Sequence, residues 1–256
     1  MKKIIAMLLA LAMVLAFAGC AQTEAPATEA PATEAPATEA PATEAPATEA
    51  PAEENAVMTY EEFMAAELED VVCVETYVQG NQSWWDNKIT VYCQGEDGAY
   101  FLYELACSEE DAAKLVPGTK IRVTGDKAEW AGEVEIMNGT FEFVEGEAYV
   151  AEALDVTELL GTEELINHQN KKVAFNGRTV EGIEYKNGEP GDDIYVTLGY
   201  NGASYSFCVE VYLTGTESDV YTTVGSLNVG DTVNVEGFLY WYEGMNPHIT
   251  AIALAE

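Results

Sequence analysis

The chain has 256 residues, with 45 acidic and 11 basic side chains and a formal net charge of −34. Hydrophobic residues make up 48% of it, which excludes disorder along the whole length, because such disorder needs low hydrophobicity together with high charge. Phosphate neutralisation needs clustered Lys and Arg, and this chain has few of them. We therefore expect no nucleic-acid partner.

The first residues are typical of a secretory signal. Two lysines precede an apolar run over 4–17, which is shorter than the roughly twenty residues that a membrane span needs. Ala18-Gly19-Cys20 then resembles the lipobox of bacterial lipoproteins, with Phe17 in place of the usual aliphatic residue. The resemblance implies a cleaved signal peptide over 1–19 and acyl chains such as palmitate on Cys20. A plain secretory signal with an incidental Cys is the alternative.

A low-complexity segment over 20–55 repeats the motif Thr-Glu-Ala-Pro-Ala. Each proline fixes its own φ and favours an extended conformation in the residue before it. Apart from its prolines, the segment has no apolar side chain larger than Ala to build a core after Cys20, and it carries acids without bases. We expect an extended polyproline II spacer between the lipid anchor and the rest of the protein.

The remaining residues contain an internal duplication. The segment Gly118–Gly125 matches Gly230–Gly237, and the acidic start of the first copy at 61–64 matches 163–166. Repeats of this kind indicate two similar structural units. We therefore expect two domains, at 56–149 and 150–256.

The first copy alternates strands with short helices. Helices are expected over 60–68 and 108–115, where Thr59 and Ser108 can serve as N-caps. Alternating apolar residues predict the strands, which run over 70–79, 88–94, 100–105, 120–126 and 133–143.

The second copy repeats this series with longer connections. A helix is expected over 162–168, and an insertion without predicted structure lies around 214–223. The predicted strands run over 172–180, 194–199, 204–212, 232–240 and 249–254.

Three strands, a helix and two further strands is the order of the OB-fold. The segment with Gly118, Gly125 and Gly132 resembles its fourth strand and hairpin, where a glycine lets the strand bend as the barrel closes. We expect a mainly β protein with two tandem OB-fold-like five-stranded barrels and short helices. The chain as a whole resembles lipoproteins of Gram-positive anaerobes with tandem OB-like domains, a family of unknown function. That resemblance implies location at the extracytoplasmic face of the cell membrane and no particular chemistry.

Aromatic residues gather in the loops that flank the ligand-binding face of an OB-fold. Adjacent residues in an extended chain point to opposite sides, so we expect one of Trp84 and Trp85 to be exposed. Exposed aromatic planes suit a sugar ring or a protein partner, and plugs for the barrel ends are the alternative. The candidate ligand-binding residues are Trp84, Trp85, Trp130, Tyr240, Trp241 and Tyr242.

The remaining chemistry is sparse. If the first hairpin is centred near Ser83, Cys73 and Cys93 lie opposite one another and could form a disulfide, with buried free thiols as the alternative. The chain has two histidines and no catalytic triad order, P-loop or dinucleotide fingerprint. We expect no enzymatic activity, no cofactor and no metal site. Calcium bound by the acid-rich turns at 95–98 and 189–193 is the alternative.

These observations predict a lipid-anchored cell-surface protein that acts as a non-enzymatic binding or interaction module. Its ligand would be a glycan or a protein. A structural or assembly subunit of an envelope complex is the first alternative, and a metal-binding stress protein is the second.

Overall fold

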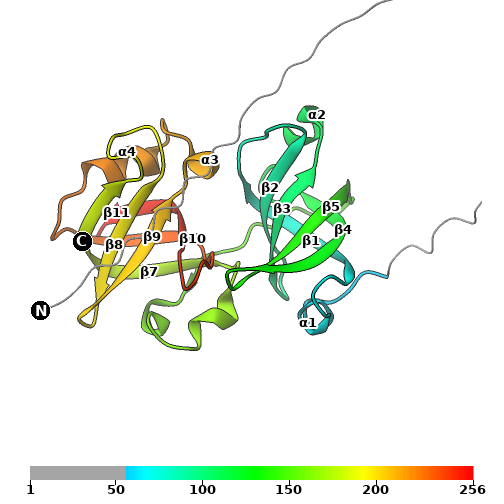
Figure 1. Cartoon of the computed structure of the whole chain (residues 1–256), viewed down its shortest axis with the longest axis horizontal. Helices are drawn as coiled ribbons and strands as arrows, with labels where there is room; N and C mark the ends of the chain where they lie inside the picture. Colours follow the sequence, from blue (N-terminus) through cyan, green and yellow to red (C-terminus); the bar gives the residue numbers. More distant parts are fainter. Residues whose placement is uncertain (1–55, 256) are drawn as a thin grey trace, which may run out of the picture. The chain divides into compact units, whose positions relative to one another are not determined.

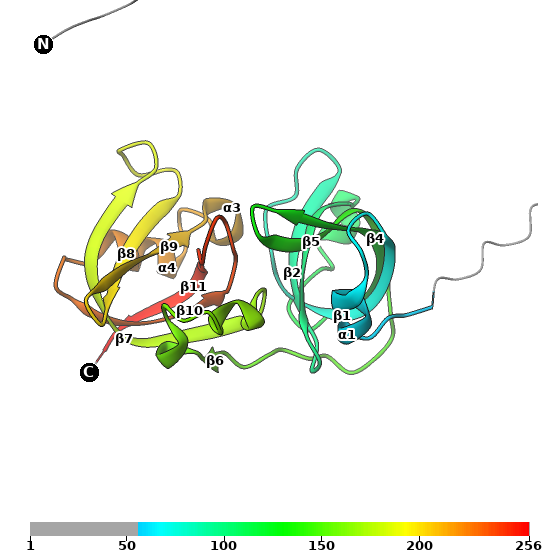
Figure 2. The same cartoon turned by 60° about the horizontal axis from the view of Figure 1, so that its bottom comes forward.

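A computed structural model describes residues 56–255, which belong to one compact unit. The expected signal peptide over 1–19, the lipid-bearing Cys20 and the spacer over 20–55 lie outside these residues. Two β-barrels follow one another along the chain, with short helices between their strands (Figure 1; Figure 2). Within this part of the chain, no helix has both the length and the apolar character needed to cross a bilayer.

Five strands close the first barrel in the order β1-β2-β3-β5-β4. All neighbouring pairs are antiparallel except β3 with β5, and this parallel pair closes the ring. The helix α1 (Tyr60–Ala65) precedes the barrel, and α2 (Glu109–Ala112) lies between its third and fourth strands. The strands are β1 (Val71–Asn81), β2 (Lys88–Gln94), β3 (Ala99–Ala106), β4 (Lys120–Trp130) and β5 (Glu133–Phe143).

The second barrel has the same strand order. Its sheet runs β10-β11-β9-β8-β7, the pairing of β10 with β7 closes it, and β6 (Leu154–Asp155) adds to β7 from outside. Its strands are β7 (Lys172–Tyr185), β8 (Ile194–Tyr200), β9 (Ala203–Val209), β10 (Thr232–Phe238) and β11 (His248–Leu254). Its helices are η1 (Thr157–Leu159), η2 (Leu165–His168), α3 (Val211–Thr214) and α4 (Asp219–Ser226). The prediction of two OB-like barrels is confirmed.

Each barrel encloses its own hydrophobic core. In β4 the inward positions alternate with half-buried ones, as the period of two in a strand requires. A helix covers an end of each core: Phe63 of α1 packs into the first core, and Val220, Tyr221 and Val224 of α4 pack into the second. Inward-facing residues of the first core are Val72, Val74, Val78, Ile89, Val91, Leu102, Ile121, Val123 and Ile136.

A glycine in each fourth strand permits the bend that closes the barrel, as the sequence predicts. The register of β4 against β5 shifts between Thr124 and Asp126, on either side of Gly125. A Cβ at Gly125 would lie 2.7 Å from Ile136 Cγ2 and 2.7 Å from the Met137 carbonyl oxygen. In the second barrel Gly237 lies at the corresponding register shift, against the backbone of His248.

Two predicted elements of the second copy are different in the structure. The strand expected to reach Tyr212 ends at Val209, because Glu210 caps the short helix α3. The connection expected around 214–223 contains α4, which begins after Ser218, whose side chain accepts a hydrogen bond from the Tyr221 amide. The insertion therefore supplies a helix to the barrel in addition to a loop.

Of the two outcomes considered for Cys73 and Cys93, a disulfide or buried free thiols, the structure shows the free thiols. All four described cysteines are free and buried. The first hairpin turns at Trp85–Lys88, so Cys93 pairs with Val78, whereas Cys73 pairs with Thr124 of β4. Five residues of strand separate Cys73 from Val78, about 17 Å at ~3.3 Å per residue, which is beyond the reach of a disulfide.

We expect Gly125→Ala to lower the free energy of unfolding by about 1–3 kcal/mol, because the new methyl group overlaps two atoms of the neighbouring strand. Gly146→Ala is the matched control, since its Cβ would meet only the flexible end of the Lys120 side chain at 3.4 Å. Urea denaturation of both variants measures the difference. Equal stability of the two variants would show that β4 does not need its glycine.

Candidate ligand-binding site

The face of the first barrel that binds ligands in OB-folds is covered by the second barrel. Tyr92 of β2 and Phe101 of β3 lie outside the first core, yet they are only 1% and 3% exposed. The ring of Phe238 stacks on Tyr92 with 4.5 Å between centroids, and the ring of Tyr240 meets Phe101 edge-on at 5.2 Å. The two barrels therefore share a third, aromatic core.

A buried histidine completes this aromatic contact. The Tyr92 hydroxyl oxygen lies 2.6 Å from His248 Nδ1, and the Tyr240 ring stacks on the imidazole at 4.4 Å. Burial lowers the pKa of His248 to about 4, so the ring is neutral at physiological pH. His248 thus acts as a hydrogen-bonding partner inside the interface.

The β4–β5 hairpin of the first barrel is held by polar contacts from the second. The Trp241 amide donates to Glu133 Oε2 at 2.8 Å, and the Glu243 amide donates to the Ala131 carbonyl at 2.8 Å. Gln169 Nε2 donates to the Gly132 carbonyl at 2.7 Å. These bonds fix the loop that begins after β10 against the first barrel.

Glu133 is fully buried in this interface. Burial raises the pKa of Glu133 to about 9, and the hydrogen bond from the Trp241 amide opposes the shift only in part. Its Oε1 has no hydrogen-bond partner, and neither has the buried Asn170 Oδ1. The Asn170 side chain also opposes the shift, and burial outweighs both hydrogen bonds, so the interface favours the neutral form of this acid.

Beside this interface, the tip of the β1–β2 hairpin presents an exposed tryptophan on a rigid turn. The amide and carbonyl groups of Trp85 and Lys88 bond to each other at 3.0 and 2.9 Å, and Asp86 and Asn87 between them have φ of 48° and 61°. This geometry is that of a tight hairpin turn. Trp85 is 80% exposed, whereas Trp84 points toward the first core and donates from Nε1 to the Cys107 carbonyl at 2.8 Å. One tryptophan of the pair is therefore exposed, as predicted.

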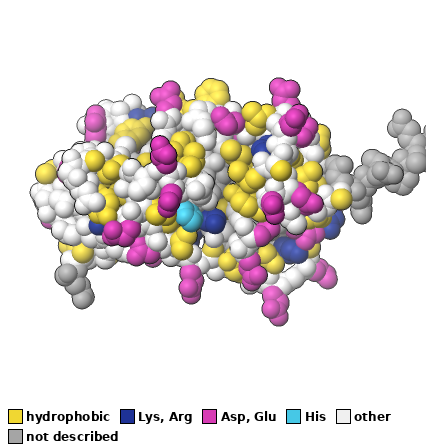
Figure 3. Space-filling model, turned by 90° about the horizontal axis from the view of Figure 1, so that it is seen from below, with side chains coloured by type: hydrophobic (Ala, Val, Ile, Leu, Met, Phe, Trp, Pro, Cys, Tyr) yellow, Lys and Arg dark blue, Asp and Glu magenta, His cyan; other side chains and the backbone are white. Residues whose placement is uncertain are grey.

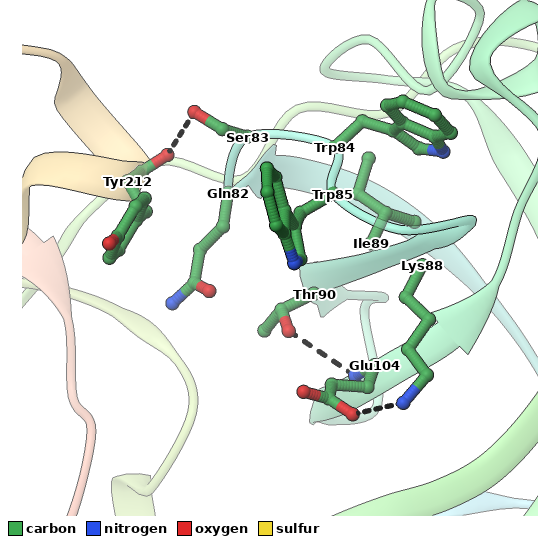
Figure 4. Close-up of a pocket in the computed structure, with 9 residues that line it drawn as sticks. All are labelled: Gln82, Ser83, Trp84, Trp85, Lys88, Ile89, Thr90, Glu104 and Tyr212. Atoms are coloured by element: carbon green, nitrogen blue, oxygen red, sulfur yellow. Dashed lines mark hydrogen bonds and ion pairs between the residues drawn. The ribbon is translucent and has the colours of Figure 1, made fainter.

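A hollow of about 400 Å³ lies at this hairpin. Figure 4 shows the rings of Trp85 and Tyr212 on opposite sides of it, with the side chain of Gln82 extending between them. Tyr212 comes from α3 of the second barrel and is 61% exposed. The full lining is Gln82, Ser83, Trp84, Trp85, Lys88, Ile89, Thr90, Glu104 and Tyr212.

Contacts across the interface fix the position of Tyr212. Its carbonyl accepts hydrogen bonds from the Ser83 amide at 2.7 Å and from Ser83 Oγ at 3.2 Å. Its amide donates to Glu210 Oε1 at 3.3 Å, and Asp193 accepts from the Val211 amide at 2.9 Å. The sequence analysis missed Tyr212 because a four-residue helix leaves no periodic signal. The only available signal was the capping Glu210.

The other predicted aromatic residues are not brought to this hollow. Tyr240 lies in the interface between the barrels. Trp241 lies 2.9 Å from the position of a Cβ at Gly132 and lines a separate shallow hollow with Met245. Trp130 and Tyr242 are 62% and 50% exposed, away from the Trp85 hollow.

The charges near the hollow are paired. Lys88 Nζ lies 2.6 Å from Glu104 Oε2 at the edge of the lining. On the face drawn in Figure 3, which views the protein from below the orientation of Figure 1, acidic side chains are spread widely with few basic ones among them. From residue 56 to 255, no group of three or more His, Cys, Asp or Glu side chains is arranged to hold a metal ion.

Comparison with known proteins identifies similarity in structure only. No protein-family model and no curated protein matches the chain. A murine DNA-binding protein bound to double-stranded DNA is matched at 11% identity and a TM-score of 0.35, over 72% of this chain and 95% of that one. The Ifi202 HINa domain in complex with a 20-base-pair DNA is matched at 12% identity and a TM-score of 0.33, over 74% and 98%.

A third match is the asparaginyl-tRNA synthetase of Pyrococcus horikoshii, at 18% identity and a TM-score of 0.28. It covers 34% of this chain and 19% of the synthetase. Likeness at these TM-scores assigns no ligand to the present chain.

One expectation is corrected by these comparisons. The sequence analysis excluded nucleic acid as a partner, and matched proteins that are bound to double-stranded DNA contradict that exclusion. The exclusion used the small number of Lys and Arg in the whole chain, whereas contacts to nucleic acid are made locally. We therefore withdraw it.

We expect Glu133→Gln to stabilise the protein increasingly as the pH rises from 5 to 9. The folded-state pKa of Glu133 is about 9, far above the ordinary value of 4.5, so its stability contribution is complete below pH 4.5 and falls as the pH rises toward 9. Gln has the same shape and does not ionise. The free energy of unfolding should match that of the native chain near pH 4 and exceed it by about 4–5 kcal/mol at pH 8, because each pH unit above 4.5 costs the native chain about 1.4 kcal/mol.

Urea titrations at a series of pH values measure this difference. Glu129→Gln is the control, because Glu129 is exposed on the neighbouring strand. A stability difference for Glu133→Gln that stays constant with pH would contradict a neutral acid in the interface.

Proposed function

We propose that the chain is a lipid-anchored, non-enzymatic binding protein whose ligand occupies the hollow between Trp85 and Tyr212. The observation that carries this proposal is the 80% exposure of a tryptophan on a rigid turn, facing a tyrosine across a cavity of about 400 Å³. Concave sites with aromatic walls and a few polar groups are the usual form of a ligand site. Gln82 and Thr90 supply amide and hydroxyl groups in the lining.

The chemistry of the hollow supports binding over catalysis. Its charged lining residues are Lys88 and Glu104, and they form an ion pair with each other. Four carboxyl or imidazole groups have strongly shifted pKa values: Glu133, Glu135, Glu210 and His248. A general acid or base must reach a substrate, and none of the four lines the hollow.

The location rests on the N-terminal sequence. The resemblance of Ala18-Gly19-Cys20 to a lipobox places acyl chains on Cys20, and the proline-rich repeat over 20–55 would hold the barrels away from the extracytoplasmic face of the membrane. A ligand carried by the envelope or arriving from outside would then reach the hollow.

For the anchor, we expect Cys20→Ser to abolish metabolic labelling of the expressed chain with palmitate and to release it from the membrane fraction. Two acyl chains give stable membrane attachment, and removing the acceptor thiol removes both. Cys107→Ser, at a buried Cys of the first barrel, is the control and should remain labelled. Persistent labelling of Cys20→Ser would contradict the lipobox assignment.

For the binding site, we expect Trp85→Ala and Tyr212→Ala each to weaken ligand binding at least tenfold, because each removes one wall of the hollow. Trp130→Ala and Tyr242→Ala are the matched controls, since both remove an exposed aromatic ring elsewhere. Binding is measured on the full chain with arrays of glycans, peptides and double-stranded DNA, the last because the matched structures include DNA complexes.

A ligand of any of these classes that depends on Trp85 and Tyr212 supports the site. Ligands that bind equally well to all four variants would overturn it. If no array ligand binds and one stoichiometric envelope partner is recovered instead, the alternative of a structural subunit replaces the proposal.

A further inference from the structure

A second hollow adjoins the first. It has a volume of about 430 Å³ and lies between β2, β3 and β5, where it shares Lys88 and Glu104 with the first hollow. The side chains of this ion pair are about half exposed, 52% and 45%. A ligand longer than one hollow can therefore pass over the Lys88–Glu104 pair into the other. The second hollow is lined by Asp86, Asn87, Lys88, Tyr103, Glu104, Ala106, Met137, Asn138, Gly139 and Thr140.

The two hollows offer different chemistry. The first has the aromatic walls Trp85 and Tyr212, whereas the second has amide and hydroxyl groups from Asn87, Asn138 and Thr140. The Asn138 side chain is oriented by a hydrogen bond, because its Nδ2 donates to Asp126 Oδ2 at 2.9 Å. The backbone carbonyl of Asn87 accepts from the Cys107 amide at 2.9 Å, which fixes the main chain at this position.

We propose, resting on the proposed function above, that the ligand is an uncharged linear oligosaccharide. One ring lies between Trp85 and Tyr212, and the chain continues over the Lys88–Glu104 pair into the second hollow. A sugar ring presents apolar C–H faces that pack on aromatic rings, and its edge carries hydroxyl groups that need both donors and acceptors. The lining supplies both kinds of group along one path.

The charges in the linings decide between neutral and acidic sugars. Lys88 is the only base in either hollow, and its ammonium group is already bonded to Glu104 at 2.6 Å. A carboxylate or sulfate on the ligand would need an unpaired cation, and Asp86 adds a further negative charge to the second hollow. An uncharged chain avoids both costs.

Calorimetric titration of the full chain with soluble gluco-, manno- and N-acetylglucosamine oligomers of one to six units tests this inference. We expect one of these series to bind, with affinity that rises at least tenfold between the disaccharide and the tetrasaccharide and then levels off. Trp85→Ala should abolish binding at every length. Oligogalacturonates of the same lengths should bind at least tenfold more weakly than the neutral series.

The variant Asn138→Gly tests the contribution of the second hollow to affinity separately from that of the first. The residue has a φ of 52° at the irregularity of β5 opposite Gly125, and glycine adopts this φ without strain, so the change removes the amide and preserves the backbone. We expect about a tenfold loss of affinity for the tetrasaccharide and no change for the disaccharide. Asn201→Gly is the matched control, because Asn201 has a φ of 51° in an exposed turn of the second barrel and lines neither hollow.

Each negative result of these titrations excludes a different part of the proposal. Affinity independent of length, equal loss of both oligomers in Asn138→Gly, or a preference for the acidic series would overturn the extended neutral ligand. A peptide or a duplex DNA that requires Trp85 would overturn the oligosaccharide and leave the binding site standing. If no probe depends on Trp85, this inference and the proposed function both fail.

Discussion

The stacking of Phe238 on Tyr92 is the contact on which the arrangement of the two barrels depends. Each barrel already encloses a core of its own, so nothing inside either barrel requires the other. Tyr92 and Phe101, however, point outward from the first barrel and would expose a large apolar patch if it stood alone. The second barrel buries them with Phe238, Tyr240 and the neutral His248. This packing also sets where α3, and with it Tyr212, lies against the β1–β2 hairpin.

The interface also buries groups that oppose folding. Glu133 and Glu135 point from β5 toward the second barrel, and burial raises the pKa of Glu135 to about 7 and that of Glu133 to about 9. Burying an ionised carboxylate without a cation would cost several kcal/mol, so burial favours the protonated form of Glu133. A neutral acid in this position lowers the stability of the fold at high pH. It also makes a specific polar contact with the Trp241 amide. Apolar packing supplies affinity between the barrels, and the polar contacts fix their register.

The sequence predicted each barrel much better than it predicted the interface between them. Alternating apolar residues identified the strands, and Gly125 with its counterpart Gly237 identified the bend, because both signals are local. The helix α4 also had a local signal, Ser218 followed by Asp219 and the spaced Val220 and Val224, but the insertion was interpreted as a loop. Tyr92 and Glu133 look like solvent-facing strand residues, and only a partner far along the chain shows that they are buried. The alternation of a strand predicted that one of Trp84 and Trp85 is exposed without saying which, whereas the position of Tyr212 depends on how the barrels pack.

Because each barrel supplies one wall of the hollow, ligand binding and docking of the barrels are linked. A ligand that contacts both Trp85 and Tyr212 stabilises the docked arrangement, and the docked arrangement raises the affinity for the ligand by the same factor. The interface is extensive without a ligand, with an aromatic core and hydrogen bonds from Ser83, Gln169 and Trp241. The walls are therefore held in place before binding, and a ligand loses little free energy to ordering them. The second barrel packs on the OB-fold face of the first, so the proposed site lies at the hairpin beside that face.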